Sequence, residues 1–393
     1  MNEIIAVISE YNPFHNGHKY QIERIKELYP DSVIIAIMSG NIMQRGDFAW
    51  IDKYNRAKAA VLCGVDCVFE LPYPFCGSNA EVFANAGVFL AISVGATHLC
   101  FGTEVGDISY VTEIADALES KNKEEIKEMT KQDRSISYPK LLEKITTLDG
   151  KEISHMPNLI LGVEYIRSIR RYGNKIIPVT IKREGFDYND LSIGENMSAS
   201  AIREYFMNNN SFISTPSALD GLYKKIIDEK LYTDINEVRE HLFRSILRMS
   251  AEEIERCYDT PSGMGYFILD TALKSTCFKD FFEGLTTKTY TYARFRRVVL
   301  YALLGVENVE REPAYTTLLA SSLKGRELLK RLKKASSIPI LTKLADYKKM
   351  NSREISQFNI SSRADILFTS FIKKGIPSGD FIKNMPYVEG SAE

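Results

Sequence analysis

Two histidines flank a glycine immediately after the first apolar run of the chain. His15 and His18 belong to Tyr11-Asn12-Pro13-Phe14-His15-Asn16-Gly17-His18, which follows the strand-like segment Ile4–Ser9. Gly17 has no Cβ, so backbone and phosphate can approach closely, and a helix starting there would direct unpaired N–H groups at an anion. Both imidazoles can donate to the charge that grows on a phosphate during displacement. The pattern predicts a nucleotide-phosphate site; the alternative is a histidine pair that only stabilises a turn.

A second polar group lies near the middle of the chain, in Ser198-Ala199-Ser200-Ala201-Ile202-Arg203. Serine often begins a helix because its hydroxyl accepts a backbone hydrogen bond. Hydroxyls at a helix start, with an arginine one turn later, also suit the terminal phosphates of a nucleotide. Alone, this segment predicts a capped helix; together with the histidines it predicts the other half of one site.

Short apolar runs and amphipathic segments alternate through the first half and must position these residues. The runs are apolar throughout, which is typical of strands buried on both faces of a parallel sheet. Strands are expected at 4–9, 32–38, 67–71, 97–101 and 175–181, with helices at 18–29, 53–64, 79–94, 157–171 and 200–207. Strand–helix repetition predicts an α/β fold with a doubly wound, Rossmann-like parallel sheet. Its ligand crevice lies at the carboxyl ends of the strands, where the histidines are expected.

The strand–helix alternation stops at a polar cluster with a proline, at 209–217. Residues 1–210 are therefore predicted to form the sheet domain, with 107–150 as a helical insertion or cover. Residues 211–393 are predicted to form a mainly helical C-terminal domain, with no convincing strand after Pro216.

Charge is distributed unevenly along the chain. Residues 1–200 carry 21 basic and 27 acidic side chains, and residues 201–393 carry 29 and 24, so a net −6 is followed by a net +5. Within 288–349, 14 basic and 5 acidic side chains give +9. A concentrated positive charge indicates a polyanion-binding region, and a solvated helical face is the alternative.

The 393 residues, 45% hydrophobic and 26% charged, have the composition of a globular chain of two or three domains, which excludes disordered and fibrous classes. No apolar run approaches 18 residues and the first residues lack the pattern of a signal peptide, so we expect no membrane span and a cytoplasmic location. The six cysteines contain no CxxC pair and, with five histidines, predict free thiols and no metal site.

His15-Asn16-Gly17-His18 resembles the HxGH signature of the nucleotidyltransferase superfamily, which is related to the class I aminoacyl-tRNA synthetases. From residue 3 to about 370, further segments resemble one family within it, the bacterial tRNA(Met) cytidine acetate ligases. These segments are Met38-Ser39-Gly40-Asn41, Gln44-Arg45-Gly46, Asp52-Lys53, Arg56-Ala57-Lys58, Val65-Asp66, Phe69-Glu70-Leu71-Pro72, Phe101-Gly102-Thr103-Glu104, Pro157-Asn158, Ile160-Leu161-Gly162, Ile181-Lys182-Arg183-Glu184-Gly185, Tyr290-Thr291 and Ala293-Arg294. Two departures are Tyr188-Asn189-Asp190, where members often have Tyr-His-Asp, and the serine motif, thinned by Ala199 and Ala201.

The resemblance implies an ATP-dependent ligase that converts acetate to acetyl-adenylate, releasing diphosphate. The acetyl group then passes to N4 of the wobble cytidine in elongator tRNA(Met), giving N4-acetylcytidine. Implied partners are ATP, acetate and this tRNA; Mg²⁺ is expected with the phosphates on charge grounds, and no membrane or obligate protein partner is indicated.

The same resemblance implies site residues one position at a time. His15 and His18 are the implied catalytic residues. The implied ATP-binding residues are Val7, Ile8, Ser9, Glu10, Tyr11, Asn12, Pro13, Phe14, His15, Asn16, Gly17, His18, Lys19, Tyr20, Gly102, Asn158, Lys182, Arg183, Ser198 and Ser200. The basic segment supplies the expected tRNA-binding residues Lys288, Arg294, Arg296, Arg297, Lys330 and Arg331, interleaved with aromatics that can stack an unpaired base. Lys53, Arg56 and Lys58 are expected near the crevice, as phosphate or tRNA contacts or as plain surface charge.

Two other functions remain open from the residues. One is a nucleotidyltransferase that transfers AMP to a small phosphorylated metabolite. The other is a non-catalytic tRNA-binding protein with a vestigial nucleotide site, against which the intact His15, Gly17 and His18 argue.

Overall fold

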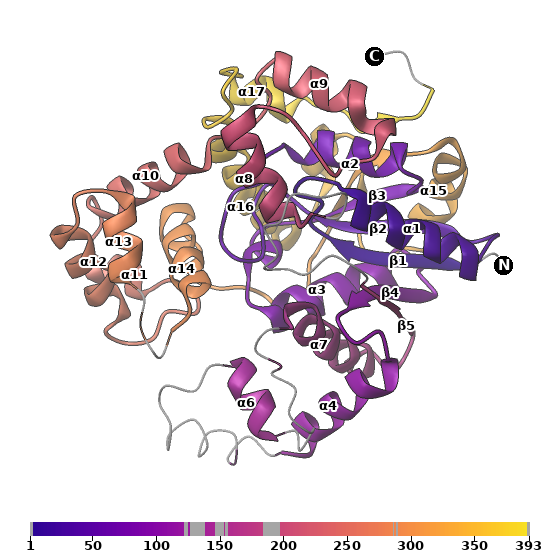
Figure 1. Cartoon of the computed structure of the whole chain (residues 1–393), viewed down its shortest axis with the longest axis horizontal. Coiled ribbons are helices and arrows are strands. Elements are labelled where there is room, and N and C mark those ends of the chain that lie inside the picture. The colour runs from indigo at the N-terminus through magenta and orange to yellow at the C-terminus, as the bar shows by residue number, and fades with distance from the viewer. Residues whose placement is uncertain are drawn as a thin grey trace.

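The computed structural model describes residues 3–121, 125, 138–145, 153, 156–183, 197–285, 287 and 290–390. Five parallel strands form the centre of its sheet in the order β5-β4-β1-β2-β3 (Figure 1). They are β1 (Ile4–Ser9), β2 (Val33–Ser39), β3 (Cys67–Leu71), β4 (His98–Thr103) and β5 (Ile177–Lys182). The α/β class with a doubly wound parallel sheet is confirmed.

Helices connect successive strands and cover both faces of the sheet. The connections are α1 (Asn16–Leu28), α2 (Lys53–Leu62), α3 (Ala80–Ser93) and, between β4 and β5, α4 (Ile108–Ser120), α6 (Tyr138–Ile145) and α7 (Pro157–Arg171). Figure 1 shows α2 above the sheet and α3, α4 and α7 below it. The strand order reverses between β1 and β4, so the switch point that opens a ligand crevice lies there.

In β2 and β3, the runs are apolar throughout because side chains on both faces of these strands are buried. Every residue of β2 and of β3 is buried. On the α3 side the packing is close: a Cβ on Gly87 would lie 2.7 Å from Cδ1 of Ile8 in β1. Glycine at this position therefore lets α3 settle directly against the central strand.

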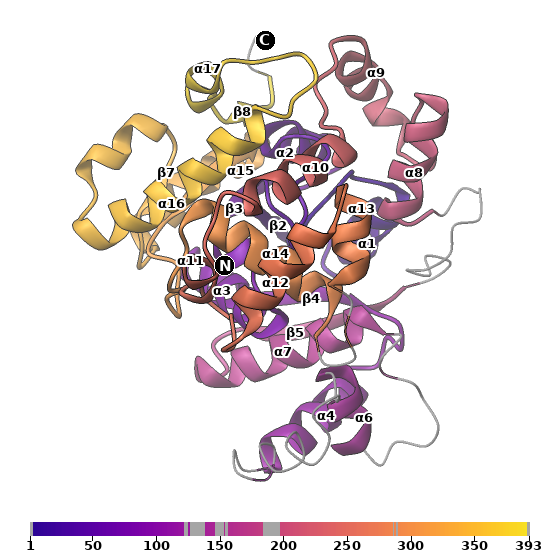
Figure 2. The same ribbon diagram turned by 90° about the vertical axis from the view of Figure 1, so that its left-hand side faces the viewer.

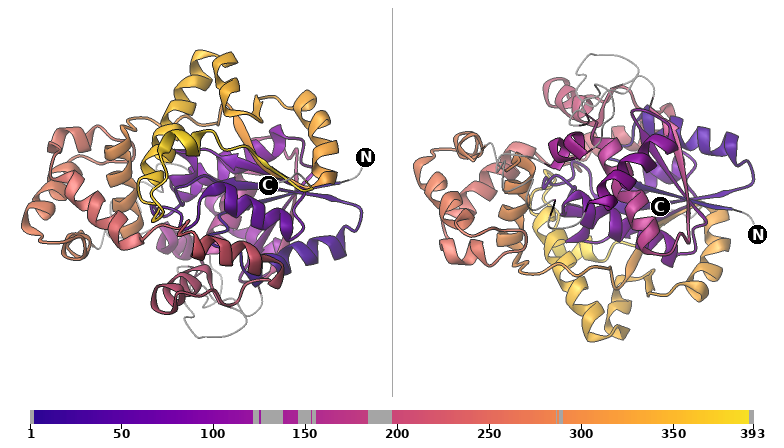
Figure 3. Two further views of the ribbon diagram at one scale, coloured as in Figure 1. Left: turned by 90° about the horizontal axis from the view of Figure 1, so that it is seen from above. Right: turned by 90° about the horizontal axis from the view of Figure 1, so that it is seen from below.

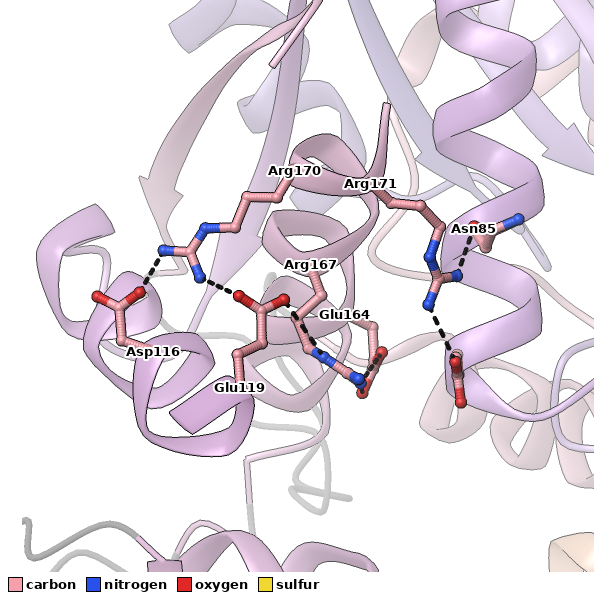
Figure 4. A network of polar contacts seen from close by, with 8 residues as sticks. Asn85, Asp116, Glu119, Glu164, Arg167, Arg170 and Arg171 are labelled. Atoms are coloured by element: carbon pink, nitrogen blue, oxygen red, sulfur yellow. Dashed lines mark hydrogen bonds and ion pairs between the residues drawn. The ribbon is translucent and has the colours of Figure 1, made fainter. Parts of the chain in front are cut away.

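The described parts of segment 107–150 are the helices α4 and α6; the rest of that prediction falls outside the described residues. Val111, Ile114, Ala115 and Leu118 of α4 are buried. Arg170 of α7 pairs with Asp116 and Glu119 of α4, at 2.5 and 2.7 Å (Figure 4). The helices of this segment are thus fastened to the sheet through α7.

The second half is mainly helical, as predicted. Its helices are α8 (Ala199–Asn209), α9 (Asp220–Asp228), α10 (Ile235–Ile246), α11 (Ala251–Glu255), α12 (Met264–Lys274), α13 (Phe278–Gly284), α14 (Tyr292–Leu304), α15 (Leu323–Ala335), α16 (Ser352–Thr369) and α17 (Ser378–Ile382). Figures 1 and 3 show α10–α14 as a group on one side of the molecule. Figure 2, viewed from that side, shows α12 and α14 in front of the strands.

The prediction of no strand after Pro216 was wrong. β6 (Thr316–Ser321) pairs antiparallel with β3 and continues the sheet, followed by β7 (Ile340–Leu341), while β8 (Tyr387–Val388) also pairs with β6. All six residues of β6 are buried, so its sequence lacks the alternation that would reveal a half-exposed antiparallel strand. The sheet therefore crosses the predicted boundary near residue 210.

In the part of the chain that the structure describes, no helix combines the length and apolar character needed to cross a membrane.

Candidate active site

The loop after β1 places both histidines at the start of α1. His15 is the N-cap residue, and its Nδ1 accepts a hydrogen bond from the backbone N–H of Gly17 at 3.0 Å. The Nδ1 of His18 in turn accepts from the backbone N–H of His15 at 3.3 Å. The centroids of the two imidazoles are 3.8 Å apart. This reciprocal cap fixes the rings side by side at the carboxyl end of β1.

The amides in the first turn of α1 are occupied within the protein. The N–H of Asn16 donates to the carbonyl of Ser214 at 3.1 Å, and those of His18 and Lys19 donate to the carbonyl of His15 at 2.9 and 3.2 Å. The expectation of unpaired N–H groups here was wrong, because each of these groups donates a hydrogen bond within the cap or the first turn. Any contact with phosphate from this segment is therefore expected from the imidazoles and not from these amides.

Both imidazoles are neutral near pH 7. Burial, reinforced by the charges of Arg183 and Arg203, lowers the pKa of His15 to about 3. Burial, with His15 and Arg183, also lowers the pKa of His18 well below its ordinary value. Since each Nδ1 accepts a backbone hydrogen bond, the one ring proton lies on Nε2. Each imidazole is consequently a hydrogen-bond donor and not a proton acceptor.

A cavity of about 1470 Å³ lies where β1 and β4 end. Its walls come from the loop after β1, from α7 and α8, from residues 43–50, and from α10 and α14. His15 and His18 line it, and so do Arg294, Arg296 and Arg297. Residues from two distant parts of the sequence, predicted separately to bind a nucleotide and tRNA, thus face one chamber.

The predicted ATP-binding segment 7–20 contains residues that line the cavity and residues that do not. Seven of its members line the cavity: Ile8, Ser9, Glu10, Tyr11, Asn12, His15 and His18. Val7 and Phe14 lie in the hydrophobic core, and Lys19 pairs with Glu23 on the outer face of α1 at 3.6 Å. Pro13, Asn16, Gly17 and Tyr20 do not line the cavity.

The serine motif begins α8 and joins the histidine loop. Ser198 is the N-cap residue, and its Oγ accepts from the backbone N–H of Ala201 at 3.2 Å. Arg203 donates from Nη1 to the carbonyl of Asn12 at 2.5 Å and from Nη2 to Oγ of Ser200 at 3.2 Å. Both serines line the cavity. The two motifs thus form adjoining walls.

Asn158 lines the cavity from the first turn of α7, one residue after Pro157. Oε1 of Glu104 accepts from its backbone N–H at 3.1 Å and from Nδ2 at 2.8 Å. Oε2 of Glu104 accepts from the N–H of Leu159 at 2.9 Å. Glu104, and not Asn158, therefore accepts the first amides of this helix, and the amide oxygen of Asn158 accepts no hydrogen bond from a described residue.

Gly102 and Arg183 share one corner of the cavity. A Cβ on Gly102 would lie 3.2 Å from Cγ of Arg183, so the missing side chain makes room first for that arginine. Arg183 lines the cavity and contributes to the low pKa of both histidines. Lys182 is exposed and does not line the cavity.

Arginines of α14 form paired charges on the opposite wall. Arg294 pairs with Asp259 at 2.7 Å, and Arg296 pairs with Asp47. Arg239 of α10 also reaches Asp47, at 3.4 Å. These carboxylates were missed in the sequence because their partners lie 35 to 249 positions away, and no local pattern marks such pairs.

Arg297 differs from its two neighbours. Its side chain is 7% exposed, and its guanidinium makes no hydrogen bond or ion pair with a described residue. Burial lowers its pKa. The guanidinium groups of the other two arginines lie over tyrosine rings. Cζ of Arg294 is 5.0 Å from the ring centroid of Tyr290, and Cζ of Arg296 is 4.6 Å from that of Tyr292. Among the described residues, Arg297 thus contributes a buried positive charge to this wall without a hydrogen bond or ion pair.

The remaining predicted tRNA-binding residues are not brought to the cavity. Lys330 and Arg331 lie on α15, which packs against β6. Figure 1 shows α15 and α14 on opposite sides of the sheet region. Lys288 falls outside the described residues.

Both alternatives for Lys53 and Arg56, contacts with phosphate or tRNA and plain surface charge, were wrong. Lys53, 2% exposed, pairs with Glu70 at 2.7 Å and with Asp365 of α16 at 2.6 Å. Arg56 is 1% exposed and donates to the backbone carbonyls of Glu10, Ser39, Gly40 and Ile51. Both cations are therefore engaged by partners within the protein, and neither lines the cavity. Lys58 lies 4.8 Å from the ring of Tyr387 and does not line the cavity.

Comparison with known proteins agrees with this geometry. Residues 1–379 match the family model described as HIGH Nucleotidyl Transferase. The tRNA(Met) cytidine acetate ligase of Clostridium tetani is 33% identical, covering 97% of this chain and 98% of its own. The ligase of the same name from Caldicellulosiruptor saccharolyticus is 34% identical, covering 91% and 92%. The crystal structure of Thermotoga maritima TmcAL bound with alpha-thio ATP superposes with a TM-score of 0.87, at 26% identity over 98% of this chain and 99% of that one.

A family match across nearly the whole sequence and full-length relatives above 30% identity point the same way. This chain belongs to the HIGH nucleotidyl transferases and, within them, to the family of the tRNA(Met) cytidine acetate ligases.

Proposed function

We propose that this protein activates acetate with ATP and acetylates N4 of the wobble cytidine in elongator tRNA(Met). The shared cavity carries this proposal, because the neutral histidine pair at the end of β1 and the arginines of α14 line the same chamber. A chamber with a phosphate-donor wall and a cationic wall suits an enzyme that activates a small acid and transfers it to RNA. The names of its relatives support the assignment.

In the first step, an oxygen of acetate attacks the α-phosphorus of ATP and diphosphate leaves. His15 and His18 donate from Nε2–H to the phosphate oxygens, where negative charge increases in the transition state. Ser198 and Ser200, with Arg203 beside them, are proposed to hold the departing phosphates. No covalent enzyme intermediate is required.

The nucleoside is proposed to lie between β4 and α7. The oxygen of Asn158 accepts from the adenine amino group, since Glu104 already holds its amide nitrogen. Gly102 and Arg183 border the ribose and α-phosphate. Lys182 is exposed and lies outside the cavity lining, so it is proposed as a more distant ATP contact.

Mg²⁺ is proposed to arrive on the triphosphate. Among the described residues, no cluster of three or more His, Cys, Asp or Glu side chains could hold a metal ion by itself. This suits an ion that keeps most of its ligands from phosphate and water. When bound, it would neutralise part of the nucleotide charge.

In the second step, the wobble cytidine enters from the α14 side. Arg294, Arg296 and Arg297 are proposed to neutralise tRNA phosphates, and Tyr290 to stack a splayed base. Lys330 and Arg331 on α15, and Lys288, are proposed as contacts with more distant parts of the tRNA. Residues 1–210 thus serve activation and 211–393 tRNA binding, in the cytoplasm, where the tRNA is found.

The decisive experiment is acetate-dependent exchange of pyrophosphate into ATP, measured with acetate, formate and propionate, with and without tRNA. Exchange that depends on acetate, followed by transfer of labelled acetyl to tRNA(Met), is the expected result. Exchange that instead requires a small phosphorylated metabolite would favour AMP transfer to such a metabolite. Tight tRNA binding without any exchange would favour a vestigial nucleotide site.

A further inference from the structure

Acetyl transfer to cytidine needs a proton acceptor. When N4 attacks the acetyl carbonyl, the nitrogen gains a bond and must lose one of its two amino protons. His15 and His18 cannot take this proton in their capped state, because each Nδ1 is occupied and each Nε2 carries hydrogen. A protein group that accepts this proton must therefore be another side chain facing the cavity.

Six carboxylates line the cavity within the described residues, and four of them pair with an arginine. The pairs are Asp47 with Arg296, Glu81 with Arg171, Glu164 with Arg167 and Asp259 with Arg294. Figure 4 shows Arg167 turned onto Glu164. Pairing with a cation makes a carboxylate a poor base. Two candidates remain, Glu10 and Glu204.

Glu10 is the better placed of these two. It directly follows β1, the central strand, and precedes the loop that carries the histidines. Its Oε1 accepts from the backbone N–H of Gln44 at 2.7 Å, and its carbonyl accepts from Arg56 at 2.5 Å. Oε2 receives no hydrogen bond from a described residue. Glu10 is thus a half-buried carboxylate with one oxygen anchored and the other directed at no internal partner, whereas Glu204 is exposed on α8.

We infer that Glu10 is the base that removes the N4 proton, an assignment that rests on the proposed function. N4 bonds to the acetyl carbon, the bond from that carbon to the adenylate oxygen breaks, and AMP leaves with the electron pair. The N4 proton passes to Oε2 of Glu10 and from there to solvent. Atoms and charge balance without any further reactant.

The role is specific to the second step. Acetate is already an anion when it attacks ATP, so formation of acetyl-adenylate has no proton to remove. Loss of the base should therefore slow transfer to tRNA far more than it slows pyrophosphate exchange. A residue that merely supported the fold would slow both.

The test compares wild type, Glu10→Gln and the control Glu204→Gln, which removes the other unpaired cavity carboxylate. Glutamine keeps the acceptor for the Gln44 amide but cannot accept a proton. Each protein is assayed for acetate-dependent exchange, for hydroxylamine trapping of acetyl-adenylate, and for single-turnover transfer of labelled acetyl to tRNA(Met). We expect Glu10→Gln to lower the ratio of transfer to exchange by about 100-fold or more. The ratio should stay near wild type in Glu204→Gln.

A Glu10→Gln protein with an unchanged ratio would overturn the inference. Parallel loss of exchange and transfer would do so as well, since it would place Glu10 on the ATP phosphates or their metal. If Glu10→Gln lowers the thermal midpoint, the ratio of transfer to exchange is measured in Glu10→Asp, which keeps the carboxylate but shifts its position. An unchanged ratio, or parallel loss of exchange and transfer, would overturn the inference in that variant too. Wild-type protein without acetate-dependent exchange would instead reject the proposed function.

Discussion

Arg56 and Arg297 are both buried arginines near one cavity, but their surroundings differ. Arg56 donates to the backbone carbonyls of Glu10, Ser39 and Gly40, where β1 and β2 end, and to that of Ile51, whereas Arg297 makes no hydrogen bond with a described residue. A buried donor without an acceptor costs free energy, so it persists where something else supplies the acceptor. The difference indicates that Arg56 stabilises the fold, and it supports the proposal that Arg297 contacts an anionic ligand.

Each of the two histidine rings has one nitrogen that bonds within the fold and one that is proposed to contact a ligand. In His15 and His18, Nδ1 accepts from a backbone N–H, and the proton on Nε2 is the one proposed above to donate to a phosphate oxygen. Structural and proposed ligand-binding roles can therefore be assigned to different atoms of one side chain as well as to different residues. Substitutions can remove either kind of contact.

The largest effect is expected for Arg56→Met. It leaves the carbonyls of buried strand ends without donors, and each orphaned buried group costs about 1–3 kcal/mol. We expect a loss of about 3–5 kcal/mol in the free energy of unfolding, measured by urea denaturation. Arg24→Met, which removes an exposed partner of Glu27, should cost less than about 1 kcal/mol. Equal losses in both variants would refute the structural role of Arg56.

Next in size is His18→Asn. Asparagine can still accept the His15 N–H through Oδ1 but lacks the Nε2–H donor. Removing one such donor typically costs about 2.7–4 kcal/mol in the transition state. We expect acetate-dependent exchange to fall about 100- to 1000-fold, with tRNA binding retained and the thermal midpoint within a few degrees of wild type. Exchange close to the wild-type rate would remove His18 from the chemistry.

A pH effect on stability follows from His15. Its folded-state pKa of about 3 lies below the value of about 6.5 in the unfolded chain, so the unfolded state binds more protons between these values. Stability is therefore complete above pH 6.5 and is lost as pH falls below it. We expect about 2 kcal/mol between pH 7 and pH 5 from this residue, and His15→Asn should flatten that slope. An unchanged slope would show that His15 titrates normally.

The smallest effect is expected for Arg297→Gln. Losing one phosphate contact should weaken tRNA binding about 10-fold and reduce the salt slope by about 1. The free energy of unfolding should not fall, because no internal partner is left behind. Arg294→Gln is the matched comparison, since it strands Asp259 and should lower stability as well. Unchanged tRNA affinity at two salt concentrations would argue that Arg297 serves another ligand.

Much of this molecule could be predicted from local pattern. Continuous apolar runs mark β1 to β5, and the two histidines around Gly17 mark the loop that follows β1. Contacts between distant segments could not be predicted. β6 reads Thr-Thr-Leu-Leu-Ala-Ser, which is neither a continuous apolar run nor a strict alternation, and the pairing of Arg296 with Asp47 depends on the completed fold. Such contacts decide whether a basic side chain pairs with an acceptor within the protein or stays available to a ligand.

The antiparallel β6 has a consequence for the chain as it is synthesised. β3 emerges from the ribosome about 250 residues before β6, its neighbour in the sheet, so the nascent protein carries an open strand edge meanwhile. Helices α10–α14 are completed during this interval, before the sheet closes beside β3. The edge of β3 is therefore covered only after α14 has been synthesised, and chaperones that shield exposed strands have the longest opportunity to act there.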